Sequence, residues 1–463
     1  MGPRPLGRRL LAGLATLALP LTALTGPGAP PSFAAPTTAF SVTWTPLAST
    51  TTADIVAVEY QSASRLWFAT AAGALYRRVG STFQQEYFAP GTVFTDLEFS
   101  PDGVNGIAVG TNGTLVRSIN GGDTWSAQVL PNGGRSSDEN CAAADQPVGD
   151  IDSVRFVDNS SVWLVGTGTQ ILRSTNSGAT FAYVNDAGTT CKVPDDVDDV
   201  FAVPGSSTAY FVGRSFGEVF QTSDNLASSA APRPASAGNG FTLVRRMVGD
   251  PASPNRQWAV TPSGAGGTYL ARTTDAWSTA DPWTIINDDT SVLTAMNDVA
   301  FAGGRVLSVG DAGTVLDSAD GVSFRLTHGP GALATTDWAS VSLANASSAV
   351  VGGIGGKLAL LTFTALRKPS AVRSVAVRGE ADALRRKVTW RAPVSNGGAS
   401  ITGYVIIVKK GARVLLRTSV GGGKRSVVVK RSKLRTGSHV VIVRARNSQG
   451  LGVAGSRSFA VRN

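Results

Sequence analysis

A small-residue turn followed by a Gly-x-apolar step recurs seven times along this sequence. The copies read FATAAGALY, VGTNGTLV, VGTGTQIL, VGRSFGEVF, PSGAGGTYL, VGDAGTVL and VGGIGGKLAL. Anchored at Gly73, Gly113, Thr169, Gly217, Gly267, Gly313 and Gly356, they are spaced by 40, 56, 48, 50, 46 and 43 residues. This period is typical of a four-stranded antiparallel unit repeated around a ring. The repeat therefore predicts an all-β fold, a seven-bladed β-propeller.

The strands of each unit follow from alternating apolar residues and from turn residues. In the second unit we expect them at FTDLEFS, GIAVG, GTLVRS and TWSAQVL, from the inner strand to the outer one. The last unit has no outer strand of its own, and SVTWTPL, residues 41–47, has no unit before it. We expect this N-terminal strand to complete the last blade, with Trp44 packed at the blade interface, because such a closure leaves no free sheet edge.

A sequence box falls in the predicted turn between the third and outer strands. Its hydroxyl and carboxamide side chains can accept turn N–H groups, its glycine permits unusual dihedral angles, and its aromatic residue can cover the gap between blades. Copies at the periphery of a ring cannot converge on one substrate, so we interpret the box as structural. Its residues are Ser118, Asn120, Gly122, Thr124 and Trp125, then Ser174, Asn176, Gly178, Thr180 and Phe181, and in shorter form Ser318, Asp320 and Phe324.

On these boxes, residues 36–366 resemble the BNR or Asp-box propellers, especially the seven-bladed type of photosystem II stability and assembly factors. The resemblance implies a binding or assembly role. Residues 367–463 resemble a fibronectin type III domain, in which Pro369 opens the module, Trp390 ends the second strand and Tyr404 lies in the third. His439 stands where that family has a corner tyrosine, so the corner hydrogen bond is not expected.

Residues 1–35 are expected to be a signal peptide. Three arginines precede an apolar run from Leu10 to Leu24, and Ser32-Phe33-Ala34 has the small-x-small pattern of a cleavage site. The run is too short to span a bilayer, so we expect a secreted protein that does not span the membrane, either released or associated with the cell envelope. Exported chains with two cysteines usually pair them, which predicts a Cys141–Cys191 disulfide, with two free thiols as the alternative.

Charge divides the mature chain into two parts. Residues 36–366 carry 17 basic and 30 acidic residues, a net of −13, whereas residues 367–463 carry 22 basic and two acidic residues, a net of +20. The basic domain is expected to bind polyanionic polymers of the cell envelope or to dock on the acidic propeller. Nucleic acid is not an expected partner, because aromatic residues do not interleave with the basic ones. The basic residues expected in turns and at strand ends are Arg385, Arg386, Lys387, Lys409, Lys410, Arg413, Lys424, Arg425, Lys430, Arg431, Lys433 and Arg435.

Charged residues stand at the start of all seven predicted inner strands. Since these strands surround the central channel with one polarity, the residues would form a rim at one end of it. The rim is either a recognition surface for a cationic, amine-bearing or polar ligand, carried by a protein or a polysaccharide, or a set of aspartates that cap backbone N–H groups. Its members are Asp54, Asp96, Asp152, Asp199, Asp298 and Asp337, with Arg245 and Arg246 in the fifth unit.

No catalytic residue, cofactor or metal site is predicted. The acidic run DDVDD, residues 195–199, lacks the glycine spacing of a calcium loop, and His328 and His439 are far apart in the chain. We therefore expect an exported binding or scaffolding protein. The alternative is an Asp-box glycoside hydrolase, sialidase-like or other, with an accessory fibronectin type III domain. Such an enzyme would need a matched pair of carboxyl groups, and the sequence singles out no pair.

Overall fold

The computed structural model describes residues 40–132, 148–185, 191–214, 218–234, 244–260, 270–273, 283–286 and 295–462. The chain divides into residues 1–35 and residues 36–463. The predicted signal peptide lies outside the described residues and stays a prediction. Within the described part, regular structure is almost entirely β-strand, and no helix there is long and apolar enough to cross a membrane. Short 3-10 turns occur at η1 (Thr111–Gly113), η2 (Gly331–Thr335), η3 (Ile354–Gly356) and η4 (Arg431–Lys433).

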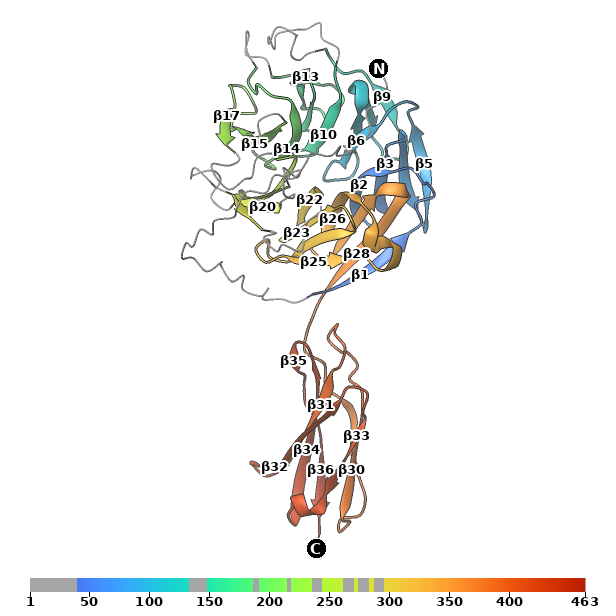
Figure 1. Cartoon of the computed structure of the whole chain (residues 1–463), viewed down its shortest axis with the longest axis vertical. Coiled ribbons are helices and arrows are strands. Elements are labelled where there is room, and N and C mark those ends of the chain that lie inside the picture. Colours follow the sequence, from blue (N-terminus) through green and yellow to red (C-terminus); the bar gives the residue numbers. More distant parts are fainter. Residues whose placement is uncertain are drawn as a thin grey trace, which may run out of the picture. The chain divides into compact units, whose positions relative to one another are not determined.

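Seven four-stranded antiparallel sheets form most of the described chain (Figure 1). Sheet 1 consists of β2 (Ile55–Ser62), β3 (Arg65–Thr70), β4 (Ala74–Val79) and β5 (Thr82–Phe88). Sheet 2 consists of β6 (Phe94–Phe99), β7 (Gly106–Gly110), β8 (Leu115–Ser118) and β9 (Ser126–Gln128). Sheet 3 consists of β10 (Ile151–Phe156), β11 (Val162–Gly166), β12 (Ile171–Ser174) and β13 (Ala182–Tyr183). Sheet 4 consists of β14 (Val197–Ala202), β15 (Ala209–Gly213), β16 (Glu218–Thr222) and β17 (Ala231–Pro234).

The remaining three sheets follow the same pattern, with one exchange in the last. Sheet 5 consists of β18 (Arg246–Asp250), β19 (Ser253–Val260), β20 (Leu270–Thr273) and β21 (Thr284–Ile285). Sheet 6 consists of β22 (Met296–Ala302), β23 (Arg305–Gly310), β24 (Thr314–Ser318) and β25 (Arg325–His328). Sheet 7 consists of β26 (Trp338–Asn345), β27 (Ser348–Gly353), β28 (Lys357–Ala365) and β1 (Phe40–Leu47), so the first strand of the described chain is its fourth strand.

The sheets are arranged in a ring. The first strand of each sheet contacts the first strand of the next, and β26 of sheet 7 contacts β2 of sheet 1. Each of the seven pairs of neighbouring sheets shares one cluster of buried apolar side chains. Burial of apolar surface between sheets is therefore the main force that holds the ring together.

The N-terminal strand completes the last sheet, as the sequence predicts. β1 pairs with β28 in an antiparallel register that runs from Phe40 opposite Ala365 to Leu47 opposite Leu358. The half-buried side chain of Trp44 packs into the apolar cluster shared by sheets 6 and 7. This pairing joins the two ends of the ring and covers the edge that β28 would otherwise expose.

The two full copies of the box form the same hydrogen-bonded turn. Ser118 Oγ accepts the N–H of Gly122 at 2.8 Å, and Asn120 Oδ1 accepts the N–H of Thr124 at 3.0 Å. The corresponding distances are both 2.9 Å in the turn that begins at Ser174. Gly122 has φ +85°, and a Cβ atom there would lie 2.4 Å from Trp67 Nε1 in sheet 1. Glycine is thus required by both the backbone conformation and the packing.

The aromatic residue of each box packs between its own sheet and the preceding one. Trp125 lies against the cluster of sheets 1 and 2, Phe181 against that of sheets 2 and 3, and Phe324 against that of sheets 5 and 6. In the short copy Asp320 Oδ1 accepts backbone N–H groups from Val322 and Ser323, each at 2.9 Å. The box residues thus make contacts within their own turns and between neighbouring sheets.

The C-terminal part, residues 367–462, contains two further sheets. One has the order β29 (Arg373–Arg378), β30 (Arg385–Arg391) and β33 (Ser426–Lys430). The other contains β32 (Arg413–Gly421), β31 (Gly403–Lys410), β34 (Gly437–Asn447) and β35 (Gly450–Leu451), with β36 (Gly455–Val461) also paired to β34. One apolar cluster includes side chains from both sheets, among them Trp390 and Tyr404, whose ring centroids are 5.3 Å apart. We call this part the C-terminal sandwich.

His439 is buried inside the C-terminal sandwich. Its Nδ1 lies 2.9 Å from the carbonyl oxygen of Gly437, two residues earlier, and its ring stacks on Phe459. The imidazole therefore makes a local backbone contact and an aromatic contact. It does so at the position where the resemblance to a fibronectin type III domain leads us to expect a tyrosine.

Candidate functional site

A cavity of about 570 Å³ lies on the axis of the ring. The first strands of all seven sheets contribute to its wall, and we call it the axial channel. Its acidic residues are Glu59, Asp96, Glu98, Asp199 and Asp298, and its basic residues are Arg65, Arg155 and Arg246. A channel bounded by β-strands in this way is a common place for a ligand site, because side chains from every repeat meet there.

A β-bulge near the start of the first strand determines which side chains line the channel. The pairing of the first strand with the second shifts by one residue in six sheets; in sheet 2, for example, the shift lies between Phe94 and Asp96. Sheet 5 lacks this bulge, and Arg246 lies opposite Val260 without a shift. Because a one-residue shift moves side chains to the other face of a strand, the bulge places Asp96, Asp199 and Asp298 along the channel wall.

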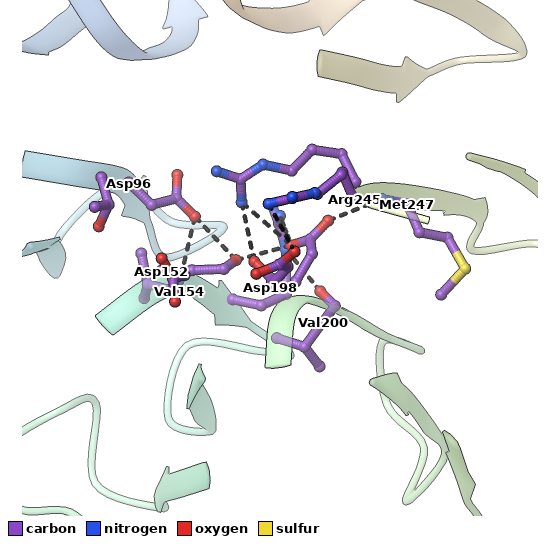
Figure 2. Close-up of polar contacts among 12 residues, drawn as sticks. Asp96, Asp152, Val154, Asp198, Val200, Arg245 and Met247 are labelled. Atoms are coloured by element: carbon purple, nitrogen blue, oxygen red, sulfur yellow. Dashed lines mark hydrogen bonds and ion pairs between the residues drawn. The ribbon is translucent and has the colours of Figure 1, made fainter. Parts of the chain in front are cut away.

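These three aspartates also connect neighbouring sheets. Oδ2 of Asp96 accepts the backbone N–H of Val154 in sheet 3 at 3.0 Å, and Oδ2 of Asp199 accepts that of Met247 in sheet 5 at 2.9 Å. Figure 2 shows both contacts. Oδ2 of Asp298 accepts the N–H of Val341 in sheet 7 at 2.9 Å. Each of these aspartates thus accepts a backbone N–H of the next sheet, and Asp96 and Asp298 also accept one from their own strands, those of Leu97 and Val299.

A second layer of side chains repeats this bridging two residues further along the strands. Glu98 Oε2 accepts the N–H of Phe156 at 2.8 Å, and Ser342 Oγ accepts the N–H of Tyr60 at 3.0 Å. Ser342 Oγ also lies 3.4 Å from Glu59 Oε2. The bridges of Ser342 join sheet 7 to sheet 1, so the channel wall is hydrogen-bonded across the position where the ring closes.

One side of the channel contains paired charges. Arg155 lies between two carboxylates, with Nη1 at 3.4 Å from Glu98 Oε1 and Nη2 at 3.5 Å from Asp199 Oδ1. Arg246 Nη1 lies 3.8 Å from the same Asp199 oxygen. Burial disfavours both guanidinium cations, but the surrounding carboxylates, Glu98 first for Arg155 and Asp199 first for Arg246, raise the pKa of each arginine above its usual value.

Other carboxyl groups of the channel have no ion-pair partner among the described residues. Glu59, Asp96 and Asp298 form no ion pair with any described residue, so the channel wall carries more carboxyl groups than guanidinium groups. Burial, followed by the nearby charge of Glu98, raises the pKa of Glu59 to about 8. Burial also raises the pKa of Glu98 to about 7 and that of Asp298 to about 6. The free channel therefore retains protons that a bound cation would displace.

A separate ion-pair cluster lies beside the starts of β10, β14 and β18 (Figure 2). Arg214 connects two aspartates, with Nη2 at 2.6 Å from Asp152 Oδ2 and Nε at 2.5 Å from Asp198 Oδ1. Arg245 Nη1 lies 3.3 Å from Asp198 Oδ2. Burial raises the pKa of Asp152 to about 6, against the opposing effect of Arg214. The charges of this cluster are largely paired within the protein.

The predicted rim is not one ring of equivalent residues. Asp54 and Asp337 precede their strands and accept N–H groups from turns of the preceding sheet, those of Gly355 at 2.8 Å and Ala312 at 2.9 Å. Asp150 and Asp196, which the sequence analysis did not select, cap turns in the same way. Asp152 and Arg245 belong to the ion-pair cluster, and the others line the channel. The grouping as a single rim is thus wrong, because its aspartates differ in position relative to the bulge: some precede it, Asp152 lies at it, and those that line the channel follow it.

Three charged channel residues of the first strands were missed by the sequence analysis: Glu59, Glu98 and Arg155. Each is a charged residue within a strand whose neighbours are buried and apolar, as in LEF and VRF. Each of them lies two residues after the residue that follows the bulge. A charged side chain in the middle of an inner strand is the signal that would have identified them.

Other predicted features have different outcomes. Among the described residues, no group of three or more His, Cys, Asp or Glu side chains is placed to hold a metal ion. Within the acidic run 195–199, Asp196 caps the N–H of Thr169 at 3.0 Å, while Asp198 and Asp199 contact arginines. Cys141 lies outside the described residues, so its pairing with Cys191 stays a prediction.

Comparison with known proteins identifies the fold. The sequence matches no protein-family model, and no curated protein is similar to it. A solved structure described as YCF48 bound to D1 peptide is 17% identical, with a TM-score of 0.52 over 69% of this chain and 96% of that one. YCF48 from Cyanidioschyzon merolae is 15% identical, with a TM-score of 0.52 over 69% of this chain and 98% of that one. The WD40 propeller domain of Doa1 is 13% identical, with a TM-score of 0.51 over 70% of this chain and 97% of that one. The chain thus contains a β-propeller fold.

Proposed function

We propose that this chain is an exported, non-catalytic binding protein whose propeller holds a basic peptide segment in the axial channel. In this proposal residues 36–366 are a seven-bladed Asp-box propeller and residues 367–463 are a fibronectin type III domain that tethers the protein to polyanionic envelope material. The signal-peptide pattern of residues 1–35 supports export. The observation that carries the proposed binding role is the set of channel carboxyl groups, Glu59, Asp96 and Asp298, that no described cation pairs with.

The size and charge of the channel suit a cationic side chain. A cavity of about 570 Å³ falls within the usual range of ligand pockets and is large enough for a lysine or arginine side chain with adjacent peptide. A cation near Glu59 would stabilise the ionised carboxylate, whose formation burial opposes. Arg155 and Arg246 form ion pairs with Glu98 and Asp199, so a ligand cation would be attracted to the carboxyl groups of Glu59 and Asp298, which form none among the described residues.

A peptide is the ligand class that the similar structures support. One of them, by its description, is YCF48 bound to a D1 peptide, which shows that a protein of similar fold binds a peptide. For this chain the acidic channel adds a charge preference, because complementary charge favours lysine- or arginine-bearing segments and disfavours acidic ones.

The glycoside hydrolase alternative has less support. Such enzymes use one carboxyl group as an acid and a second as a nucleophile or base, held at a defined separation. Asp96, Asp199 and Asp298 each accept a backbone N–H from the next sheet, so their positions have a structural explanation. Burial raises the pKa of both Glu59 and Glu98, so their environments do not separate into acid and base roles.

The binding role is tested by calorimetry with short peptides of opposite charge. Tetralysine and tetraarginine should bind the mature chain at pH 8.5, whereas tetraglutamate should not. Glu59→Gln should weaken tetralysine binding about tenfold, since it removes a carboxylate whose hydrogen bond in the described part of the chain is with Ser342. Glu380→Gln, which neutralises an exposed carboxylate in the C-terminal sandwich, is the matched control and should leave the affinity unchanged. Equal binding of tetraglutamate, or an unchanged affinity of the Glu59 variant, would contradict the proposal.

The tethering role is tested by co-sedimentation of the mature chain with isolated cell envelopes across a salt series. Binding through exposed charges should decrease steeply as salt rises, because exposed charges are screened over about 10 Å at 0.1 M salt. Salt-independent sedimentation, or none, would contradict tethering by the basic domain. The second outcome is expected if the basic domain binds the acidic propeller instead.

A further inference from the structure

The outer face of the three-stranded sheet in the C-terminal sandwich carries a group of exposed basic residues. Along β30, the buried side chains of Arg386, Val388 and Trp390 alternate with exposed or half-exposed ones. The exposed basic residues of β29, β30 and β33 are Arg373, Arg378, Arg385, Lys387, Arg391 and Lys430. Five of the six stand at the first or last position of a strand, which agrees with the sequence expectation of basic residues at strand ends, and Lys387 lies within β30. We call these six residues the basic sheet face.

The residues of the basic sheet face lie opposite one another across the strands. Arg385 is paired in register with Lys430, Lys387 with Arg378, and Arg391 with Arg373. Like charges at directly opposite positions of antiparallel strands destabilise a sheet. Between residues 367 and 462 only two acidic residues, Glu380 and Asp382, are present, and the described structure shows no ion pair in this range. The fold itself therefore gains nothing from this arrangement of charge.

Arg386, a buried arginine of β30, has a structural role and can be compared with the residues of the basic sheet face. The Arg386 side chain is 5% exposed, donates to the carbonyl oxygens of Gly379 and, at 2.7 Å, of Ala460, and lies over the ring of Phe459. On the basic sheet face, by contrast, the side-chain contact that the structure shows is one from Arg373 Nε to the carbonyl oxygen of Ala392 at 3.0 Å. The remaining five side chains are available to a ligand.

We propose that the basic sheet face binds an anionic polysaccharide that carries carboxylates at regular intervals. Exposed residues two apart on a strand are about 7 Å apart and those on neighbouring strands about 5 Å apart, so the face presents a lattice of cations to a linear polymer. Arginine forks form paired hydrogen bonds to carboxylates, and the 53% exposed side chain of Val428 offers an apolar contact beside Lys387. This inference rests on the proposed tethering role and names its surface and ligand class.

The test uses the mature full-length chain and polygalacturonate as the probe. The wild-type protein should bind at 50 mM salt and lose affinity steeply as salt rises. The double variant Arg385→Glu with Lys387→Glu should bind about tenfold more weakly or worse. The matched control is Arg417→Glu with Arg444→Glu, which reverses two exposed arginines on the other sheet and gives the same net charge. It should keep the wild-type affinity within about twofold, and both variants should melt close to the wild-type temperature.

The possible failures are distinguishable. Equal losses in the two double variants would show that total charge, and not the basic sheet face, determines binding; this would overturn the inference and leave tethering intact. Binding to double-stranded DNA with equal or greater affinity than to polygalacturonate would overturn the assignment of a polysaccharide ligand. If the wild-type chain binds neither polygalacturonate nor isolated envelopes, both the inference and the tethering proposal fail.

Discussion

The indole rings of Trp44 and Trp338 stack with their centroids 6.0 Å apart and their planes inclined by 28°. Trp44 belongs to β1, near the start of the described chain, whereas Trp338 begins the first strand of the same sheet almost 300 residues later. The stacked pair lies in the apolar cluster between sheets 6 and 7. Closure of the ring therefore combines eight residue pairs between β1 and β28 with aromatic packing.

Removal of the closing strand should destabilise the propeller strongly. Deletion of residues 36–47 would expose the whole edge of β28 and uncover the indole of Trp338, so the melting temperature should fall sharply. Trp44→Ala alone should reduce the free energy of unfolding by about 2 kcal/mol, less than a fully buried tryptophan, because the side chain is half-buried. Thermal and urea unfolding followed by tryptophan fluorescence measure both effects.

Thr45→Ala is the control for the closing strand, because Thr45 is exposed in the same strand and pairs with Leu360 only through the backbone register. It should melt close to the wild type. A deletion variant with an unchanged melting curve would show that β1 does not contribute to ring stability.

The repeated turns should have equal energetic roles in different sheets. Ser118→Ala and Ser174→Ala each remove a buried hydroxyl that accepts a glycine N–H, at 2.8 Å and 2.9 Å respectively. Each substitution leaves a buried N–H without its acceptor and should cost about 1–3 kcal/mol of stability. The two costs should add in the double variant, because the turns belong to different sheets and share no hydrogen bond. Urea unfolding of the four proteins measures the sum.

Neither turn variant should change the affinity for tetralysine, since neither serine lines the axial channel. A loss of binding at matched stability would contradict the purely structural interpretation of the box.

Sequence periodicity predicted the strands well because each repeat buries the same pattern of apolar residues. The four strands expected for the second unit correspond to β6, β7, β8 and β9, and the missing outer strand of the last unit predicted the role of β1. The two full boxes predicted turns that proved identical in hydrogen bonding. In these cases each repeat tests the interpretation of the others, since a pattern that recurs in several units is less open to chance than a single motif.

The site was predicted less well because a β-bulge has no clear sequence signal. Asp96 follows the bulge of its strand and lines the channel, whereas Asp152 lies at the bulge of its own strand and contacts Arg214 in the ion-pair cluster. A shift of one residue changes the face on which a side chain lies, and periodicity alone does not locate that shift. The basic sheet face was predicted only in part for a related reason. Arg385, Lys387 and Lys430 were named among the basic residues, but their pairing with one another and with Arg378 across the strands is set by sheet order.

The channel glutamates should make the propeller less stable as pH rises. Burial raises the pKa of Glu59 from its ordinary 4.5 to about 8, so the folded protein keeps a proton that the unfolded chain releases above pH 4.5. The free energy of unfolding should therefore fall as pH increases from about 4.5 to about 8 and should then level off. Glu98, with a pKa raised to about 7, acts in the same direction. Glu59→Gln should make this decrease shallower, as measured by urea unfolding at pH 5, 6.5 and 8.5.

The exposed Glu380→Gln variant should retain the full wild-type decrease between pH 5 and pH 8.5. A Glu59 variant with the wild-type pH dependence would show that this carboxyl group ionises normally in the folded protein. That result would also remove the expected link between ligand binding and proton release.

Arg155 should limit the affinity of the channel for cations. Its guanidinium group lies within 3.5 Å of both Glu98 and Asp199, so Arg155→Gln would leave two additional carboxyl groups without their nearest cation. The loss of this opposing charge should raise the pKa of Glu98 further and reduce stability by about 1–3 kcal/mol, since the ion pair is only partly buried. A tetralysine ligand could replace the missing charge, and its affinity at pH 8.5 should increase severalfold. Arg155→Lys, which keeps the positive charge, should show a smaller increase. Weaker tetralysine binding in Arg155→Gln, at a pH and temperature where the variant is folded, would mean that the ligand cation does not enter this part of the channel.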